Sequence, residues 1–477
     1  MAHRGDKYRR KKRIMTKTKG SRRPHHDLTT GSIPSHLIRM TLPLVIGLLA
    51  NMAYGLVDLY FVGMLGDNEL AAMGYVTSVT MLLISACIGL SAGTSSVLAR
   101  ASGRKDHDAI VCLSTSSFYL TLLISLGLSL IGLITINPLF TLIGANEAIL
   151  PLIRDYIVIW YISSIFVIAP IVGMAAMRAM GDTMTQTKIN IAAAIANVIL
   201  DPIFIFGWFG FPRLEIQGAA LATAIARGGV FFAIYGVLYY RFEAIEFSRA
   251  ILERFREAAR SILQVAVPAA ATNMIIPAGN VVLIGIISGY GQNAVAATNV
   301  AARIESLCLV FFFSLSAVIG PVVGQNLAAH KFDRIEEALK TVLAFCLAWG
   351  AVLAVTIALL ANFLAGQFSD DPYIIEKAVA YLYLIPVSYG AYGFVMSANA
   401  SFNGIGRPLP GVIVSTLRTV VLPLPIIYFA SMYYDLPVIY GITSACNIVA
   451  GAVSFFWVMK TVRDLRPEPR PATQVSG

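Results

Sequence analysis

Twelve apolar runs, each long enough to cross a lipid bilayer as a helix, most constrain what this chain can fold into. The hydrocarbon core of a bilayer takes about 20 apolar residues of helix per crossing. Charged residues make up 13% of the chain, against about a quarter of an average soluble protein, which excludes a water-soluble enzyme. We therefore predict an all-α integral membrane protein with twelve transmembrane helices. The predicted spans are 38–64, 70–99, 111–136, 149–177, 187–208, 216–240, 262–288, 293–325, 341–363, 374–402, 408–431 and 437–459.

The distribution of basic residues predicts how these spans are oriented. Lys and Arg near the ends of spans are retained on the cytoplasmic side of a membrane. The joints on one side hold 14 of these residues, and the opposite joints hold at most three. Both termini are therefore predicted to be cytoplasmic, with the chain in the cell (inner) membrane.

The formal net charge of +10 belongs to one tail. Residues 1–40 hold 12 Lys and Arg against two acidic residues, and the remainder is formally neutral. The basic charge therefore gives no reason to expect nucleic acid as a partner. We expect the tail to contact anionic membrane lipids, at about 1 kcal/mol for each basic residue near the surface, and we expect function to survive deletion of residues 2–30.

The chain contains an internal duplication. An offset of 222 residues matches Gly63 with Gly285, and after a short insertion an offset of 225 matches Gly181 with Gly406. Chance apolar similarity would not keep glycine and polar positions in order over so long a stretch, and transporters are often built from such repeats. We predict two pseudo-symmetric six-helix bundles. The domains are a basic cytoplasmic tail at 1–36, an N-terminal six-helix lobe at 37–240, a cytoplasmic amphipathic linker at 241–260, a C-terminal six-helix lobe at 261–462 and a cytoplasmic tail at 463–477.

Two carboxylates are predicted to lie deep in the N-terminal lobe. A charge at the middle of a bilayer costs about 2.5–3.5 kcal/mol on insertion scales, so it usually marks a pathway or a relay. All six histidines lie in tails or loops, which leaves carboxylates as proton carriers. Asp58 lies deep in the first span, and Asp201 lies deep in the fifth, four residues after Asn197 and so on the same helix face. The duplicate of Asp58 is Asn280, and packing alone would not require an acid in one half only.

Two prolines accompany these carboxylates. Pro202 follows Asp201 directly, and it deprives the Val198 carbonyl of its regular helical hydrogen bond. Such a break is tolerated in a membrane where it lines a cavity. Pro43 precedes Asp58 by fifteen residues and is predicted to kink the first span, either statically or in response to protonation of Asp58.

Three motifs resemble those of the multidrug and toxic compound extrusion (MATE) transporters. They are YGLVDLYFVGMLGDNELAAMG at 54–74, AMRAMGDTMTQTKI at 176–189 and NVILDPIFIFG at 197–207, and the similarity covers residues 35–462. The resemblance implies a V-shaped pair of bundles that exports small organic compounds in exchange for protons or sodium ions. Within the family, the chain is similar to the DNA-damage-inducible-protein-F-like branch, whose coupling acids lie in the N-terminal lobe. The residues that the resemblance assigns to the cation site are Asp58, Asn197 and Asp201, with Thr223 as a looser match.

We predict a proton-coupled antiporter in which Asp58 and Asp201 carry protons and Asn197 is their hydrogen-bond partner. No Walker loop is present, so ATP is not the energy source, and we expect neither a cofactor nor covalent chemistry. One alternative is sodium coupling at Asp58, Asn197 and Asp201. Others are a lipid or lipid-linked-sugar flippase of the wider superfamily, a receptor or channel-like protein, and a purely structural role in which the two aspartates hydrogen-bond between helices.

The expected partners are cationic or amphipathic drugs and toxins, membrane lipids, and no second subunit. Methionine and aromatic side chains suit promiscuous binding, although most such residues in a membrane bundle are packing. Arg303, Glu305 and Arg418 either form structural ion pairs or line a C-terminal cavity. Residues predicted to line the substrate cavity are Tyr54, Met52, Asn51, Met174, Asn273, Met274, Arg303 and Phe312.

Overall fold

The structure, a computed structural model, describes residues 27–467, which fold into helices joined by short turns. The first group of helices, called the N-lobe here, comprises α2 (Ile33–Gly63), α3 (Asp67–Gly103), α4 (His107–Leu142), α5 (Leu150–Ile162), α6 (Ser164–Ala179), α7 (Met184–Phe206) and α8 (Glu215–Tyr240). The second group, the C-lobe, comprises α9 (Arg249–Ile287), α10 (Gln292–Cys308), α11 (Val310–Ala328), α12 (Phe332–Gly366), α13 (Pro372–Leu384), α14 (Tyr389–Ile405), α15 (Leu409–Thr416), α16 (Pro423–Ala430) and α17 (Leu436–Asp464).

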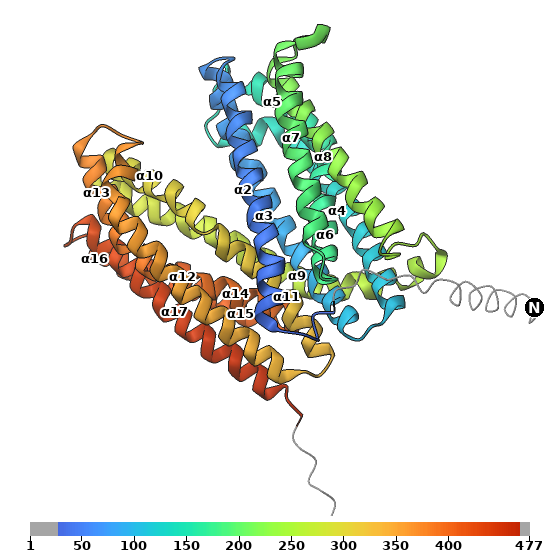
Figure 1. Cartoon of the computed structure of the whole chain (residues 1–477). Coiled ribbons are helices and arrows are strands. Elements are labelled where there is room, and N and C mark those ends of the chain that lie inside the picture. The colour runs from blue at the N-terminus through green and yellow to red at the C-terminus, as the bar shows by residue number, and fades with distance from the viewer. Residues whose placement is uncertain (1–26, 468–477) are drawn as a thin grey trace, which may run out of the picture.

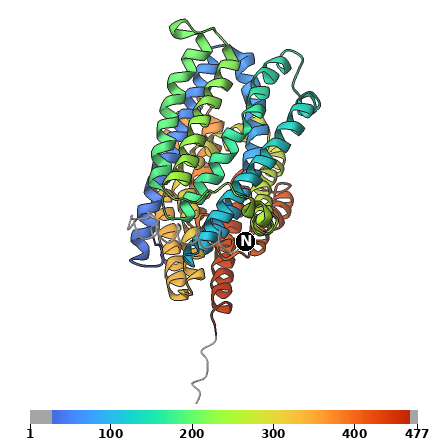
Figure 2. The same cartoon turned by 90° about the vertical axis from the view of Figure 1, so that its right-hand side faces the viewer.

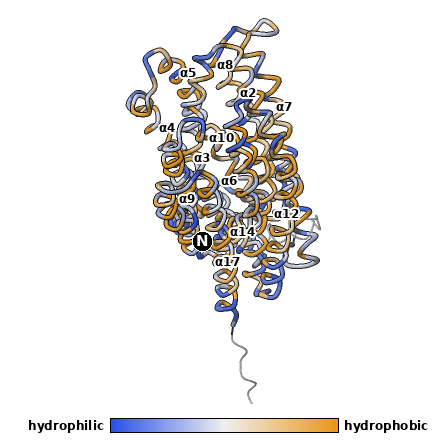
Figure 3. Tube along the Cα trace, turned by 90° about the vertical axis from the view of Figure 1, so that its left-hand side faces the viewer, coloured by the Kyte–Doolittle hydropathy of each residue, from blue (hydrophilic) through white to orange (hydrophobic). Residues whose placement is uncertain are grey.

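The helices account for the predicted spans. In the described part of the chain, eleven stretches are long and apolar enough to cross a membrane, and α5 and α6, bent by 50° at their junction, make a twelfth. Along the tube in Figure 3, hydrophobic residues dominate the lengths of the helices and hydrophilic ones gather at the turns. The prediction of an all-α protein with twelve transmembrane helices is confirmed.

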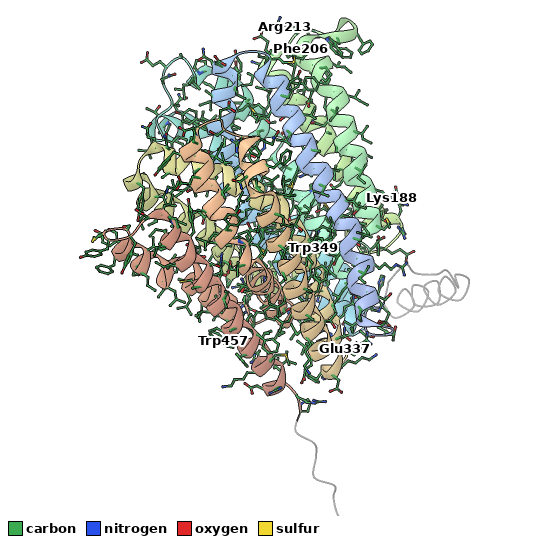
Figure 4. All side chains as sticks on the ribbon, turned by 60° about the vertical axis from the view of Figure 1, so that its left-hand side comes forward. Lys188, Phe206, Arg213, Glu337, Trp349 and Trp457 are labelled. Carbon is green, nitrogen blue, oxygen red and sulfur yellow. The ribbon has the colours of Figure 1, made fainter. Side chains whose placement is uncertain are left out.

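The two lobes form a V. In Figure 1 the N-lobe and the C-lobe diverge toward the top and meet toward the bottom. Figure 2 shows the N-lobe helices running lengthwise in front, with the lower end of α17 extending beneath them. We call the diverging end the open end and the other the closed end. Arg213 lies at the open end and Glu337 at the closed end (Figure 4).

Glycines bring the lobes together at the closed end. A Cβ atom on Gly93 of α3 would lie 2.5 Å from the Ile262 carbonyl oxygen of α9, and one on Gly103 would lie 2.2 Å from the Gln325 carbonyl oxygen of α11. Real Cβ atoms do not approach other atoms so closely, so only glycine permits this backbone contact. The sequence thereby allows α3 to pack directly on two C-lobe helices.

The duplication is visible in the backbone. Gly181 and Gly406, which the offset of 225 residues matches, adopt left-handed φ angles of +85° and +86° in the turns that follow α6 and α14. The breaks between α5 and α6 at Ser163 and between α13 and α14 at Pro386–Ser388 also correspond. Each lobe is therefore built on the same plan.

A short segment before α2 joins the lobes. We call Asp27–Gly31 the N-terminal strap. The Leu28 N–H donates to Gln325 Oε1 at 3.1 Å, and Lys331 Nζ donates to the Thr29 carbonyl at 2.7 Å. On the N-lobe side, Lys105 forms an ion pair with Asp27 at 3.1 Å. The strap therefore lies across the closed end and contacts both lobes.

Three of the predicted domain boundaries fall inside continuous helices. The helix that contains most of the predicted linker 241–260 begins at Arg249 and runs unbroken through the next span as α9. α2 begins at Ile33, inside the predicted tail 1–36, and α17 continues to Asp464, past the predicted boundary at 462. Residues 1–26 of that tail, and 468–477 of the C-terminal tail, lie outside the described residues.

Candidate functional site

Four polar side chains predicted as the coupling site come together inside the N-lobe. Asp58 lies on α2, Asn197 and Asp201 lie one turn apart on α7, and Thr223 lies on α8. The side chains are withdrawn from solvent: Asp58 is 8% exposed and Asp201 is 0% exposed. Asp58 and Asp201 are also close enough to interact electrostatically. We call this group the N-lobe carboxylate cluster.

Asn197 links the cluster to the neighbouring helix. With its amide oriented to match its surroundings, the Asn197 nitrogen donates to Asp201 Oδ2 at 3.2 Å and its oxygen accepts from the Thr223 backbone N–H at 3.2 Å. Amide orientation is assigned from such networks, and this one satisfies both ends of the side chain. Asn197 thus holds the Asp201 carboxylate in place against α8.

Each carboxylate has a buried oxygen without a hydrogen bond. Asp58 Oδ1 and Asp201 Oδ1 are buried and have no partner among the described residues. Nor does any Lys, Arg or His there form an ion pair with either group. Buried polar atoms in proteins are nearly always satisfied, so an orphaned carboxylate oxygen calls for an explanation such as a bound ion, proton or water.

Tyr156 belongs to the same cluster and was missed in the sequence. It lies on α5, is 5% exposed, and its hydroxyl interacts with the Thr223 side chain and with the charges of Asp58 and Asp201. A signal was available, because the offset of 225 residues pairs Tyr156 with Tyr381. Two tyrosines at matching positions inside apolar spans would have marked a shared polar site.

A narrow pocket reaches the cluster from one side. Its lining includes Asn51, Tyr54, Asn197, Thr223 and Arg227. Arg227 donates to Asn51 Oδ1 at 3.1 Å and lies over the Tyr54 ring, 5.5 Å from its centroid. Asn51 and Tyr54 therefore sit beside the coupling site rather than between the lobes.

The C-lobe holds a second, half-buried network, centred on Glu305 of α10. Tyr381 of α13 donates a hydrogen bond to the Glu305 carboxylate, and Arg418 attracts it electrostatically. Arg418 lies in a π-helical turn, Leu417–Val421, donates to Asn447 Oδ1 at 3.0 Å and lies 4.1 Å from the centroid of the Tyr392 ring. Of the two interpretations left open for Glu305 and Arg418, the contacts favour a structural electrostatic network.

A cavity of about 310 Å³ lies between the lobes near the closed end. The α3, α6, α9, α11 and α14 helices all contribute to it. We call it the central cavity. Asn273, one of the predicted substrate contacts, lines it. Its amide also donates to the Ala269 carbonyl of its own helix at 2.8 Å.

Other predicted substrate contacts lie elsewhere. Phe312 is fully buried in the C-lobe core, where its ring packs against Gly393, and Met174 is buried in the N-lobe core. Neither side chain lines the central cavity or the pocket beside Asn51, because each points into the core of its own lobe. Met52 is half-buried, Met274 and Arg303 are exposed, and none of the three lines the central cavity or the pocket beside Asn51.

Neither of the two prolines ends its helix. α2 continues through Pro43 and α7 continues through Pro202. Proline lacks an N–H, so the Val198 carbonyl, one turn before Pro202, loses its regular donor. That carbonyl lies next to Asn197 in the chain and adds a free backbone oxygen near the N-lobe carboxylate cluster.

Comparison with known proteins identifies the family. The MatE family model matches residues 43–203 and, a second time, residues 268–429. A protein named FAD transporter from Shewanella oneidensis is 35% identical over 411 residues, covering 86% of this chain and 90% of the relative. The probable multidrug resistance protein YoeA of Bacillus subtilis is 25% identical, covering 91% of this chain and 97% of the relative.

A solved structure supports the same conclusion. The bent form of the Vibrio cholerae MATE transporter VcmN aligns with a TM-score of 0.86 at 25% identity, covering 91% of this chain and 98% of that one. The V of two lobes, the twelve spans and the double match of the family model agree with one another. The chain is therefore an integral membrane transporter, not an enzyme, and belongs to the MATE family of multidrug efflux proteins.

Proposed function

We propose that this chain is a proton-coupled antiporter that exports small organic compounds, with the N-lobe carboxylate cluster as the coupling site. The observation that carries the proposal is the pair of buried carboxylates, Asp58 and Asp201, that lack both an ion-pair partner and a hydrogen bond to one oxygen each within the described part of the chain. When both are ionised they repel each other, and a bound proton or cation relieves that repulsion. Asn197 and Tyr156 position the two groups.

The proposed cycle moves this site between the two sides of the membrane. We assign the closed end to the cytoplasm, because Arg100, Lys105, Lys331 and Arg334 lie in the joints there, in line with the positive-inside rule. The V then faces outward in the cell membrane. Protons enter from the open end, load the carboxylates and favour closure of the lobes, and they are released on the cytoplasmic side after the lobes reopen there.

The energy of this exchange is sufficient for export. One elementary charge moving across the membrane supplies about 2.3 kcal/mol per 100 mV. At about 1.4 kcal/mol per decade, that drives a concentration ratio of roughly 50-fold for each coupled charge.

Sodium is the alternative coupling ion at the same site. Hard cations prefer oxygen ligands, and the cluster offers carboxylate oxygens from Asp58 and Asp201 and a hydroxyl from Thr223. The Asn197 amide adds an oxygen if it turns over from the orientation in which its nitrogen donates to Asp201. Under this alternative, the orphaned carboxylate oxygens are ligands rather than proton acceptors.

Flavin dinucleotides are a second class of cargo beside the drugs and toxins predicted from the sequence. The relative that is 35% identical over most of both chains carries the name FAD transporter. Others that match less closely, at 23–25% identity, carry names of multidrug proteins.

Transport in proteoliposomes tests the coupling. Purified protein is reconstituted, a pH gradient is imposed with and without a sodium gradient, and accumulation of ethidium and of FAD is followed by fluorescence. We expect the pH gradient alone to drive accumulation. Accumulation under a sodium gradient only would overturn proton coupling, and accumulation under neither would overturn the antiporter itself.

A further inference from the structure

The central cavity has an unusual charge pattern for a site that takes cations. Arg178, at the end of α6, is the one charged side chain among the described residues that line it, and no carboxylate lines it. The other polar lining comes from hydroxyls and amides, and two aromatic rings are present, Phe313 and Tyr392. No carboxylate in this lining can pair with a cationic drug, and the one full charge there repels it.

Arg178 has hydrogen-bonding capacity to spare. Its Nη1 donates to Gln186 Oε1 at 3.2 Å and its Nη2 donates to Ser91 Oγ at 3.4 Å, while its Nε is buried without a partner. A guanidinium carries five N–H donors in a planar fork. Several of these donors therefore remain for a ligand.

No carboxylate of the described chain neutralises Arg178. The acid nearest in sequence, Asp182, pairs with Arg241 at 3.2 Å and accepts from the Thr185 N–H and hydroxyl. A guanidinium withdrawn from water is costly unless an anion pairs with it. The missing anion can arrive with the ligand.

Asn399 also lines the cavity, but its side chain packs toward α15. Its amide donates to Ser415 at 2.8 Å, and its buried Oδ1 atom lies 3.1 Å from where a Cβ atom on Gly411 would stand. The free hydrogen-bonding capacity of the cavity is therefore that of Arg178. A ligand that satisfies it carries an anionic group.

We propose that the central cavity binds the oxyanion and one ring of an aromatic phosphate or carboxylate, with Arg178 as the anion-binding residue. The planar fork of arginine matches the two oxygens of such groups. Phe313, which is 46% exposed, offers a face for the ring, whereas Arg418 already lies over the Tyr392 ring. The volume of about 310 Å³ lies at the lower end of ligand pockets, so it holds the headgroup of a larger molecule. This inference names the cargo class of the proposed exporter and rests on that function, but its first test does not depend on coupling.

The first test is equilibrium binding in the absence of any gradient. The probes are riboflavin, which is neutral, riboflavin 5′-phosphate, which adds one phosphate at the end of the ribityl chain and leaves the ring unchanged, and ethidium, which is cationic. Full-length protein in phosphatidylcholine nanodiscs is titrated by flavin or ethidium fluorescence. We expect the phosphate to bind about tenfold to hundredfold more tightly than riboflavin, as charge-assisted hydrogen bonds imply. Equal affinities for the two flavins would overturn the proposal.

The second test is substitution of the arginine. In Arg178→Gln we expect the advantage of the phosphate to disappear, while ethidium binding stays the same or improves. Arg178→Lys keeps the charge without the fork and should retain part of the advantage, which also separates recognition from misfolding. Arg407→Gln is the matched control, since it removes an exposed arginine at the same end of the molecule. If Arg178→Gln weakens all three probes equally, Arg178 is structural and the proposal fails.

A third arm separates a soluble cargo from a lipid headgroup. Phosphatidylglycerol, an anionic phosphate lipid, is added to the nanodiscs. If it displaces riboflavin 5′-phosphate from the wild type and not from Arg178→Gln, the cavity takes the headgroup of a lipid and the assignment to a soluble aromatic anion is overturned. The coupling proposal is judged separately, because an Asp58→Asn variant should keep this binding while losing gradient-driven transport.

Discussion

The two lobes have the same helix arrangement, but the carboxylates inside them have different partners. In the N-lobe, Asp58 and Asp201 lie together with no cation partner among the described residues. In the C-lobe, Glu305 is held by Tyr381 and attracted by Arg418. The tyrosines of the two networks, Tyr156 and Tyr381, occupy equivalent positions in the duplicated chain.

The backbone of the C-lobe departs from the shared plan where its charges lie. α3 is continuous, whereas the corresponding C-lobe span is divided at Leu309 into α10 and α11, just after Glu305. α7 is continuous, whereas its counterpart contains the π-helical turn with Arg418. Such turns often mark functional sites, and here the turn presents Arg418 to the network. The comparison teaches that one scaffold can hold a compensated carboxylate in one copy and an uncompensated pair in the other.

The largest effect is expected from neutralising an aspartate of the N-lobe. Asp58→Asn or Asp201→Asn keeps the shape of the side chain but cannot release a proton, so each transport cycle is coupled to one charge fewer. At 100 mV, the loss of one coupled charge lowers the attainable concentration ratio by roughly 50-fold, measured as steady-state accumulation in proteoliposomes.

The matched control for that prediction is Glu305→Gln in the C-lobe. Because Glu305 accepts a hydrogen bond from Tyr381 and is attracted by Arg418, we expect it to carry no coupled proton, and the accumulation ratio of Glu305→Gln should stay near that of the wild type. If Glu305→Gln loses coupling as completely as Asp201→Asn, the functional distinction between the lobes is wrong.

Removing the C-lobe cation should affect stability rather than coupling. Arg418→Leu leaves the Glu305 carboxylate without its cation and Asn447 without a donor, at a cost of about 1–3 kcal/mol. The midpoint of thermal unfolding in detergent reports this cost. The double variant Glu305→Gln with Arg418→Leu should recover much of it, and a double variant less stable than the single one would contradict a compensated pair.

The equivalent tyrosines offer a smaller and more direct comparison. Tyr156→Phe removes a hydroxyl beside the N-lobe carboxylate cluster. The free energy of proton binding to the cluster should change by about 0.5–1.5 kcal/mol, which is roughly twofold to tenfold in apparent proton affinity. Tyr381→Phe removes the donor to Glu305 and should leave that affinity unchanged. The pH dependence of initial transport rates distinguishes them, and equal shifts in both variants would count against the assignment.

The smallest effect concerns a carboxylate outside the lobes, in the N-terminal strap. Partial burial disfavours the ionised form of Asp27, but hydrogen bonds from Thr29 and Lys105 outweigh it and hold its pKa at about 2, below the ordinary value of 3.8. A lowered pKa stabilises the folded state above pH 3.8, and the contribution is lost as the pH falls toward 2. Exposed pairs contribute about 0–1 kcal/mol.

Thermal unfolding of Asp27→Asn and the wild type across this range checks the sign. The variant should be slightly less stable at pH 7, and the difference should shrink as the pH falls below 3.8. A difference that grows on acidification would contradict the lowered pKa.

Hydropathy and internal repetition sufficed to predict the twelve spans and the two lobes, because both depend on the order of residues along the chain. The depth of Asp58 and Asp201 in apolar spans, and the shared helix face of Asp201 and Asn197, could be predicted from the residues. The grouping of these three with Thr223 was what the resemblance to the MATE family implied. The position of Phe312 in the core of the C-lobe could not be predicted in this way. Whether a side chain points into its own lobe or between lobes depends on how each helix is rotated, and a nearly all-apolar span gives little periodic signal for that rotation. Likewise, no pattern in the sequence predicted the π-helical turn at Arg418.

The N-terminal strap has a practical consequence for how the protein can be shortened or tagged. Removing residues 2–30, which we predicted to leave function intact, also removes the Thr29 carbonyl that accepts from Lys331 and the Leu28 carbonyl that accepts from Arg334, and it leaves Arg334 with the Gly31 carbonyl. A cut placed before Asp27 discards the basic charge and spares those acceptors. Comparing the two truncations would assign any change in transport either to electrostatic attachment at the lipid surface or to the bridge between the lobes.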